Sequence, residues 1–477
     1  MRKIYTFTIP RDTFDETQPD KRVIRNLIRE HIAIAQHLHA NMDYYKGKHK
    51  ITTEENRQNK LVCNHAHDIS DTAFSYFIGN PIAYTCKDDI TPLTDALELA
   101  GADEADGDNG LELSIYGLAY EYIYLKEDEN DLCIKNLSAE HTFMVKDDSI
   151  EEKELFAVYY YIRKDDSRKE RDHFIATVLT KSFKYELDIE DCDEPQTMDE
   201  IGKEHFLGDI PVVEYLNNKM AIGDFELQIP LIDAYNALMS DRVTDKEQFI
   251  NSILAIYGTL LVDDNEKEGE EDAGIKEFKK RLKQYQILEL PDTAKAEYLT
   301  RTFDETGVEI LKKAIEQDIH KFSHIPCMTD ESFGGNVSGV AMEFKLLGME
   351  DITKIKTRYY RKGLRKRLRI FCNYLSIHQK MNLDPAGITM TFTRALPKNL
   401  LEISQIVSNL WGKVSKKTLL SQIPFVDDVD EELKEVEKET QENIENQQKM
   451  FGNDLNTPPD QPDGASAEDD VNHDEKE

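Results

Sequence analysis

The chain has 477 residues, 39% of them hydrophobic, a mean hydropathy of −0.59 and a formal net charge of −34 at pH 7. This length exceeds what one hydrophobic core supports, so two or more domains with extensions are expected. The absence of an 18-residue apolar run excludes a membrane-spanning helix, and Met1–Pro10 lacks the continuous apolar stretch of a signal peptide. The negative charge argues against a general nucleic-acid binder, because such proteins neutralise phosphates with lysine and arginine.

The negative charge is concentrated at one end of the chain. Residues 427–477 hold nineteen acidic residues and four lysines, so nearly half of the net charge lies there. The six cysteines are far apart and form no CxxC pair, a pattern typical of reduced thiols in a cytoplasm.

The first half of the chain mixes helical and strand patterns. Residues 20–46 carry apolar side chains at helical spacing after Asp20, a residue type that caps helices. A second helix is predicted over Asn64–Phe77, followed by an edge strand over Pro81–Thr85. Residues 101–110 form a loop or the start of a helix. The β-rich runs that follow, within residues 115–187, are Tyr120–Leu125, Leu155–Ile162 and Phe174–Leu179, and together these patterns predict a mixed α+β domain up to about residue 225.

Two helices around an insert are predicted next. The first helix covers Pro230–Ile256, and the second covers Asp304–Ser323. The residues between them contain short strands, an acidic loop (Asp263–Asp272) and a basic helix (Gly274–Gln286), which indicates a compact α/β unit. The second helix has an apolar seam for neighbouring helices, formed by Leu311, Ile315, Ile319 and Phe322.

A glycine-containing loop separates this helix from the next one. Pro326 disfavours helix immediately before it, and Gly334–Gly335 reach positive φ at low cost, so the backbone can turn there. Ser338 is a suitable cap for a helix that continues to about Met381. Its apolar stripe slips by about one residue at Gly363, which favours a kink. Considered alone, the loop fits a surface connector between two helices better than it fits a functional hinge.

The remaining chain is mostly helical and then acidic. A strand is predicted over Ile388–Thr393, followed by helices over Pro397–Val414, Lys416–Ser421 and 428–450. The segment Asn453–Glu477 has almost no large apolar residues and is predicted to be disordered.

Common catalytic motifs are missing from the sequence. It has no phosphate-binding P-loop, dinucleotide fingerprint, nucleophile elbow or HExxH helix. Cys63 and His67, four residues apart, could share a helical face and bind zinc, but no second ligand pair follows at a suitable spacing. The nine basic residues from Lys354 to Arg369, uninterrupted by any acid, fit equally a solvated helix face and a surface that binds DNA or an acidic neighbouring subunit.

Four stretches, in order over about residues 60–350, resemble portal proteins of tailed bacteriophages, the head-to-tail connectors, of the type found in Bacillus siphoviruses. They are Asn64–Tyr84, with its Gly79-Asn80-Pro81 turn; Tyr116–Glu121; Ile210–Asp241; and Phe333–Ala341. This resemblance implies a portal fold and a ring of about twelve subunits at one capsid vertex. The implied regions are a wing (1–229), stem helices (230–258 and 304–327), a clip (259–303), a tunnel loop (328–338), a long kinked helix returning to the wing (339–384), a mostly helical crown (385–450) and an acidic tail (451–477).

The resemblance also implies where the ring contacts its partners. The tunnel loop would face double-stranded DNA in the channel through Thr329, Asp330, Glu331, Ser332, Phe333, Gly334, Gly335, Asn336 and Val337. The clip would present its docking surface through Asp263, Asp264, Glu266, Lys276, Lys279, Lys280 and Lys283. The implied partners are other copies of the chain, the terminase large subunit, a head-completion adaptor, and the major capsid and scaffolding proteins.

The same resemblance places the ring in the virion, assembled in the host cytoplasm, with no cofactor, catalytic residue, metal or membrane contact. A different class remains open from the residues alone: a metal-dependent nuclease or another cytoplasmic scaffold protein. Acid-rich segments are weak support for a nuclease, because a two-metal site needs carboxylates that converge from fixed strands.

Overall fold

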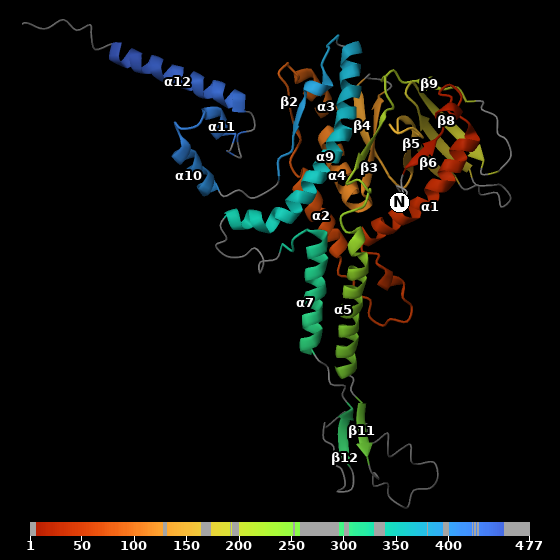
Figure 1. Cartoon of the computed structure of the whole chain (residues 1–477). Coiled ribbons are helices and arrows are strands. Elements are labelled where there is room, and N and C mark those ends of the chain that lie inside the picture. The colour runs from red at the N-terminus through yellow and green to blue at the C-terminus, as the bar shows by residue number, and fades with distance from the viewer. Residues whose placement is uncertain are drawn as a thin grey trace, which may run out of the picture. The chain divides into compact units, whose positions relative to one another are not determined.

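In the computed structural model, the described residues are 6–126, 131–163, 173–190, 192, 200–250, 253–257, 295–299, 305–328, 339–378, 380–394, 400–421, 423, 426 and 429–452. They divide into two compact units, Met1–Leu396 and Pro397–Glu477, coloured from red to blue in Figure 1. Helices and sheets are mixed in the first unit, as the sequence predicted. No described helix is both long enough and apolar enough to cross a membrane.

Both N-terminal helices begin close to the predicted starts, and each has a capping side chain. Helix α1 (Lys21–Tyr45) follows Asp20, whose side chain accepts a hydrogen bond from the Arg22 amide at 2.8 Å. Helix α2 (His65–Ile78) follows Asn64, whose side chain accepts from the His67 amide at 3.2 Å. These contacts satisfy amide groups that a helix start leaves free. The other helices of this region are α3 (Thr91–Leu99) and α4 (Ala102–Tyr116).

Glycines set both ends of α4. Gly101 and Gly117 have φ of 72° and 81°, in the left-handed region that glycine adopts at low cost. A Cβ on Gly117 would lie 2.3 Å from the Ala221 carbonyl oxygen. Residues 102–110, which the sequence left open between loop and helix, therefore belong to a helix.

Two sheets form the body of the first unit. A six-stranded sheet has the order β1-β5-β6-β7-β8-β9, and a three-stranded sheet has the order β10-β3-β4. All neighbouring strands are antiparallel except β1 and β5. The strands are β1 (Phe7–Ile9), β3 (Leu118–Leu125), β4 (Leu132–Leu137), β5 (Thr142–Asp147), β6 (Glu154–Arg163), β7 (His173–Leu179), β8 (Phe183–Glu190), β9 (Lys203–Glu204) and β10 (Val212–Leu216). The expected strand at residues 81–85 is β2 (Ala83–Thr85), which pairs with β13 (Thr389–Thr391).

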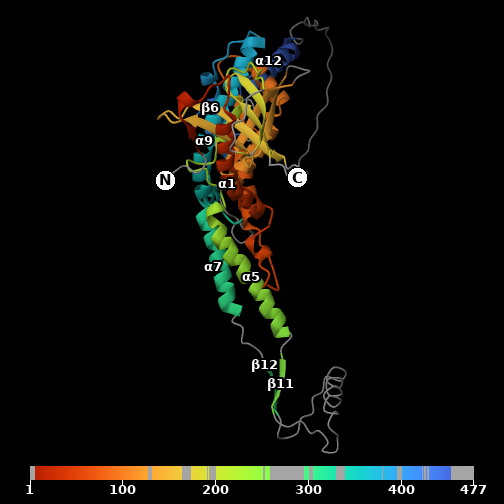
Figure 2. The same cartoon turned by 90° about the vertical axis from the view of Figure 1, so that its right-hand side faces the viewer.

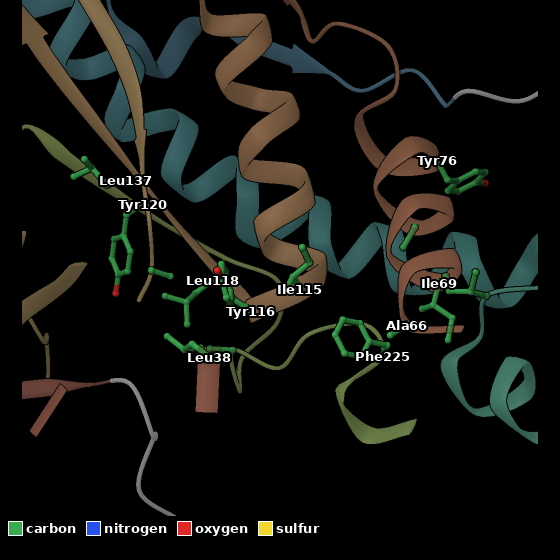
Figure 3. Close-up of a cluster of buried hydrophobic side chains, with 14 of the residues drawn as sticks. Leu38, Ala66, Ile69, Tyr76, Ile115, Tyr116, Leu118, Tyr120, Leu137 and Phe225 are labelled. Atoms are coloured by element: carbon green, nitrogen blue, oxygen red, sulfur yellow. The ribbon is translucent and has the colours of Figure 1, made fainter. Parts of the chain in front are cut away.

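Three clusters of buried apolar side chains fill this unit. One joins α1 to the six-stranded sheet through Ile24, Ile28, Phe143 and Val158. A second lies between α3, the three-stranded sheet and a later helix. Figure 3 shows part of the third, which gathers side chains from α1, α2, α4 and neighbouring strands: Leu38, Ala66, Ile69, Tyr76, Ile115, Tyr116, Leu118, Tyr120, Leu137 and Phe225.

Helices α5 (Ile229–Ile250) and α7 (Glu305–Ser323) lie side by side in both Figure 1 and Figure 2. Arg242 of α5 joins them by ion pairs to Glu305 at 2.6 Å and to Glu309 at 2.8 Å. The predicted helix over Pro230–Ile256 is wrong at its end. Residues Ile253–Tyr257 form strand β11, which pairs antiparallel with β12 (Lys295–Leu299).

Helix α9 (Gly339–His378) continues through Gly363 without interruption. A Cβ on Gly363 would lie 2.4 Å from Cδ1 of Tyr215, so this glycine lets α9 approach strand β10 closely. The sequence predicted that Gly363 allows a kink, but the structure instead explains this glycine by its close packing against Tyr215. Figure 1 shows a bend in the N-terminal part of α9, before the helix runs along the sheets.

The second unit contains α10 (Leu400–Leu410), α11 (Lys416–Leu420) and α12 (Val429–Gly452), near the helices that the sequence predicted. Short 3-10 helices elsewhere are η1 (Arg11–Thr13), η2 (Lys50–Thr53), η3 (Glu226–Gln228) and η4 (Pro385–Gly387). The predicted disordered tail, Asn453–Glu477, lies outside the described residues.

Candidate channel and docking surfaces

The predicted channel loop and clip surface lie outside the described residues. The loop Thr329–Val337 falls between the end of α7 at Ser323 and the start of α9 at Gly339. The clip residues from Asp263 to Lys283 fall between the paired strands β11 and β12. The structure therefore describes the elements that flank both segments.

The four predicted stem residues do not share one buried surface within the chain. Ile319 is fully buried in the core cluster of Figure 3, and Ile315 packs against that cluster. Leu311 is 50% exposed and Phe322 is 56% exposed. The neighbouring Ile310 is 65% exposed. The apolar stripe of α7 is thus buried at Ile319 but partly exposed at Leu311 and Phe322.

The basic run on α9 supplies buried ion pairs, a use that neither sequence interpretation included. Lys356 is 2% exposed and donates to Asp224 at 2.6 Å. The same carboxylate accepts from Ser114 at 2.7 Å and from Asn217 at 2.9 Å. A second buried cation, Lys366, contacts Glu154 and donates to the Val212 carbonyl oxygen at 2.7 Å.

The third buried cation, Arg367, is fully buried in the second core cluster. It contacts Glu121, with Nε 2.8 Å from Oε1, and Asp106, with Nη2 2.6 Å from Oδ1. The two carboxylates also accept from the hydroxyls of Tyr215 and Tyr360, at 3.0 and 2.5 Å. Burial alone would lower the pKa of Arg367, but the two carboxylates raise it well above its ordinary value. The guanidinium therefore stays charged and fixes α9 to α4 and β3.

A sequence signal for this cation does exist. Arg367 lies among the side chains that form the apolar stripe of α9: Tyr360, Leu364, Leu368 and Phe371, all fully buried. A cation inside an apolar stripe must be paired, since an isolated buried charge is very costly. The sequence interpretation treated the run by charge alone and missed it.

Cys63 and His67, which the sequence offered as one possible ligand pair, do not share a helical face of α2. Cys63 precedes the Asn64 cap of α2, whereas exposed His67 pairs with Asp71 at 3.1 Å. Burial raises the pKa of the Cys63 thiol. Within the described part of the chain, no three histidine, cysteine or acidic side chains are grouped so that they could hold a metal ion.

A buried carboxyl on α4 is a further feature that sequence patterns did not indicate. One carboxyl oxygen of Glu112 is buried without a hydrogen-bond partner. Burial raises the pKa of Glu112 to about 8, with smaller contributions from Asp108 and Glu140 in the same direction, although a hydrogen bond with Asn136 lowers it. The folded protein therefore favours the protonated form of this side chain near neutral pH.

Comparison with known proteins supplies the family. The family model "Phage portal protein, SPP1 Gp6-like" matches residues 24–446. The portal protein of Bacillus phage SPP1 is 26% identical over 94% of this chain and 93% of its own length. The portal protein of Clostridium phage phiCD119 is 26% identical over 49% of each chain. Among solved structures, the neck of an empty GTA particle computed with C6 symmetry aligns with a TM-score of 0.45 and 11% identity, over 75% of this chain and 90% of that chain. The match over residues 24–446 includes every strand of the two sheets except β1, the α5–α7 pair, α9 and most of the second unit. It shows that the chain belongs to the SPP1 Gp6-like family of phage portal proteins.

Proposed function

We propose that about twelve copies of this chain form a closed ring at one vertex of a phage capsid. The ring encloses the channel through which double-stranded DNA enters during packaging and leaves during ejection. The single observation that carries this proposal is the family match over residues 24–446. The match includes the paired helices α5 and α7, the β11–β12 pair between them in the chain, and the long helix α9.

The order of elements supports an assignment of regions. The sheets and helices up to residue 229 form the wing, α5 and α7 form the stem, and residues 259–303 form the clip. The tunnel loop covers residues 328–338, and α9 leads back to the wing, where its buried cations join it to α4 and β10. Residues 385–450 form the crown, and residues 451–477 form an acidic tail inside the capsid.

The acidic composition suits a channel for DNA. The formal charge of −34 per chain is repeated in every copy of a ring. A duplex that moves through a channel must not bind its wall tightly, so weak or repulsive contact with phosphates is useful. The tunnel loop follows this pattern, with Asp330 and Glu331 beside Gly334–Gly335.

The clip is the proposed docking surface for the terminase large subunit and the head-completion adaptor. Its acidic segment Asp263–Asp272 and its basic segment Lys276–Lys283 offer both signs of charge within about twenty residues. Charges of both signs favour steering and a fixed register of a docked partner. The major capsid and scaffolding proteins would contact the ring through the wing and crown.

A packaging assay tests the function and the loop separately. Procapsids are assembled with the wild-type chain, without it, and with Gly334→Pro/Gly335→Pro, and DNA protected from nuclease is measured. Proline fixes φ near −65° and removes two N–H donors, so the double-proline rings should form but package little DNA. Gly334→Ala/Gly335→Ala, which keeps both donors, is the matched control and should package more.

Each comparison has a contradicting result. Full packaging by procapsids without the chain would contradict the proposed function. Wild-type packaging by well-formed double-proline rings would mean that residues 329–337 are only a connector between α7 and α9.

A further inference from the structure

The outer face of α9 carries a row of four exposed cations, three of which have no side-chain partner among the described residues. Arg358, Lys362, Arg365 and Arg369 are exposed and follow each other at spacings of four, three and four residues, so they lie on one side of the helix. Arg369 pairs with Asp209. Within the described residues, Arg358, Lys362 and Arg365 have no ion pair or hydrogen bond. We call these three residues the α9 stripe.

The α9 stripe places three cations that have no ion pair with a described residue together on one side of one helix. The protein has 93 acidic residues against 59 lysines and arginines, and three other cations of the same helix are already buried in ion pairs. The α9 stripe spans eight residues, or about 11 Å of helix at ~1.5 Å per residue step. It is therefore a compact basic surface on an otherwise acidic molecule.

The same unit carries an acidic surface that also lacks partners. Asp95 and Glu98 of α3 and Asp103 and Glu104 of α4 are exposed, and none has an ion pair with a described residue. Leu99 lies among them in sequence and is 69% exposed. Asp103 and Glu104 also favour the N-terminus of α4, but Asp95 and Glu98 have no such role. We call Asp95, Glu98, Asp103 and Glu104 the α3–α4 patch.

We propose that the α9 stripe of one copy docks on the α3–α4 patch of the next copy. This inference rests on the proposed ring and identifies a contact that holds it together. A closed ring needs two different, complementary surfaces on each subunit, so that each copy contacts its neighbours head to tail. The stripe and the patch are two such surfaces, with opposite charge and similar numbers of charged groups.

A neighbouring protein fits the α9 stripe better than DNA does. Ile355, 44% exposed, lies three residues before Arg358, beside the α9 stripe. Exposed apolar side chains gain from burial against a protein, and Leu99 in the patch offers an apolar counterpart. Phosphates would offer no such burial to Ile355.

Charge reversal in both surfaces tests the contact. The first variant is Arg358→Glu/Lys362→Glu/Arg365→Glu, and the second is Asp95→Lys/Glu98→Lys/Asp103→Lys/Glu104→Lys. Each alone brings like charges together, so the fraction of chain in rings, counted by electron microscopy and native mass spectrometry, should fall about tenfold or more. When the two variants are mixed, every contact between unlike copies again joins opposite charges, and rings of alternating variants should return to near the wild-type fraction.

A matched control separates this contact from the effect of total charge. Lys87, Lys181 and Lys219 are exposed and have no ion pair with a described residue. Lys87→Glu/Lys181→Glu/Lys219→Glu changes the net charge by the same amount as the first variant. It should leave the ring fraction within about twofold of the wild type.

Several outcomes overturn the inference. The first is a loss of rings in the control variant. The second is a mixture that does not restore rings although each variant unfolds at the wild-type temperature. The third is the formation of intact rings by the first variant. Intact rings of the first variant that fail to package DNA would assign the α9 stripe to DNA instead. Absence of rings from the wild-type chain would contradict the proposed function itself, a result distinct from all of these.

Discussion

Arg367 belongs to the basic run on α9, but its side chain forms ion pairs in the interior of the protein. Its guanidinium is fully buried between Asp106 and Glu121. Two tyrosine hydroxyls also donate hydrogen bonds to these carboxylates. Removal of one partner from such a network leaves unpaired buried charges, which costs more than the pair itself contributes. The position of α9 on the sheet therefore depends on this side chain.

Arg367→Met should lower the free energy of unfolding by about 3–5 kcal/mol, because it leaves Asp106 and Glu121 unpaired in the core. Chemical denaturation of the unassembled chain measures this change. Arg365→Met, two residues away on the exposed face, is the control and should change stability by about 0.5 kcal/mol or less. Equal effects of the two substitutions would contradict the buried network.

Glu112 should make the stability of the chain depend on pH. Its pKa in the folded state, about 8, lies above the value of 4.5 for an unperturbed glutamate. The folded state therefore binds the proton more tightly, so its stability is fully present below pH 4.5 and falls as the pH rises toward 8. Glu112→Gln imitates the neutral form.

This variant should match the wild type near pH 4.5 and exceed it by roughly 1–3 kcal/mol at pH 8. Thermal unfolding over this pH range is the measurement. An exposed carboxylate on the same helix, Glu104→Gln, should show no such trend. A variant that gains no stability at pH 8 would mean that Glu112 ionises freely in the folded protein.

At the scale of elements, two glycines in helices should respond to alanine in opposite ways. Gly107 of α4 has open space where a Cβ would lie, whereas a Cβ on Gly363 of α9 would lie 2.4 Å from Cδ1 of Tyr215. Gly107→Ala should therefore raise stability by about 0.5–1 kcal/mol through helix propensity. Gly363→Ala should lower it by about 1–3 kcal/mol through overpacking.

Denaturant midpoints of both variants test this pair. A stabilising Gly363→Ala would show that α9 can move away from β10 at little cost. The close approach of these two elements would then not be a requirement of the fold.

Local signals predicted many element boundaries, and long-range pairing decided the others. Asp20 caps α1 as expected, because a cap depends only on residues within one turn, and α2 begins beside the predicted start at Asn64. The run Ile253–Tyr257 is too short for periodicity to separate helix from strand, and its partner β12 begins 38 residues later. The role of Gly363 depends on Tyr215, nearly 150 residues earlier in the chain, and so was equally beyond local patterns.

The candidate surfaces were predicted to different degrees. The portal resemblance is confirmed by the family match. The channel loop and clip residues remain predictions, because they lie outside the described residues. The basic run was recognised as unusual, but its division into three buried and several exposed cations needed the partners that the fold supplies from α4, β3, β6 and Asp224, which follows β10.

At the scale of the whole molecule, the proposed ring would use two kinds of contact. The exposed part of the α7 apolar stripe, with Leu311 and Phe322 half exposed, would be covered by a second stem. The α9 stripe and the α3–α4 patch would set the register between wings. In the proposed ring, apolar contact and charge would thus come from different elements.

Electron microscopy of the purified full-length chain tests most directly whether it forms the proposed ring. The proposed function predicts closed rings of about twelve subunits with an open central channel. A chain that stays monomeric, or that forms only two-fold dimers, at concentrations where the wild-type protein is folded would contradict the account.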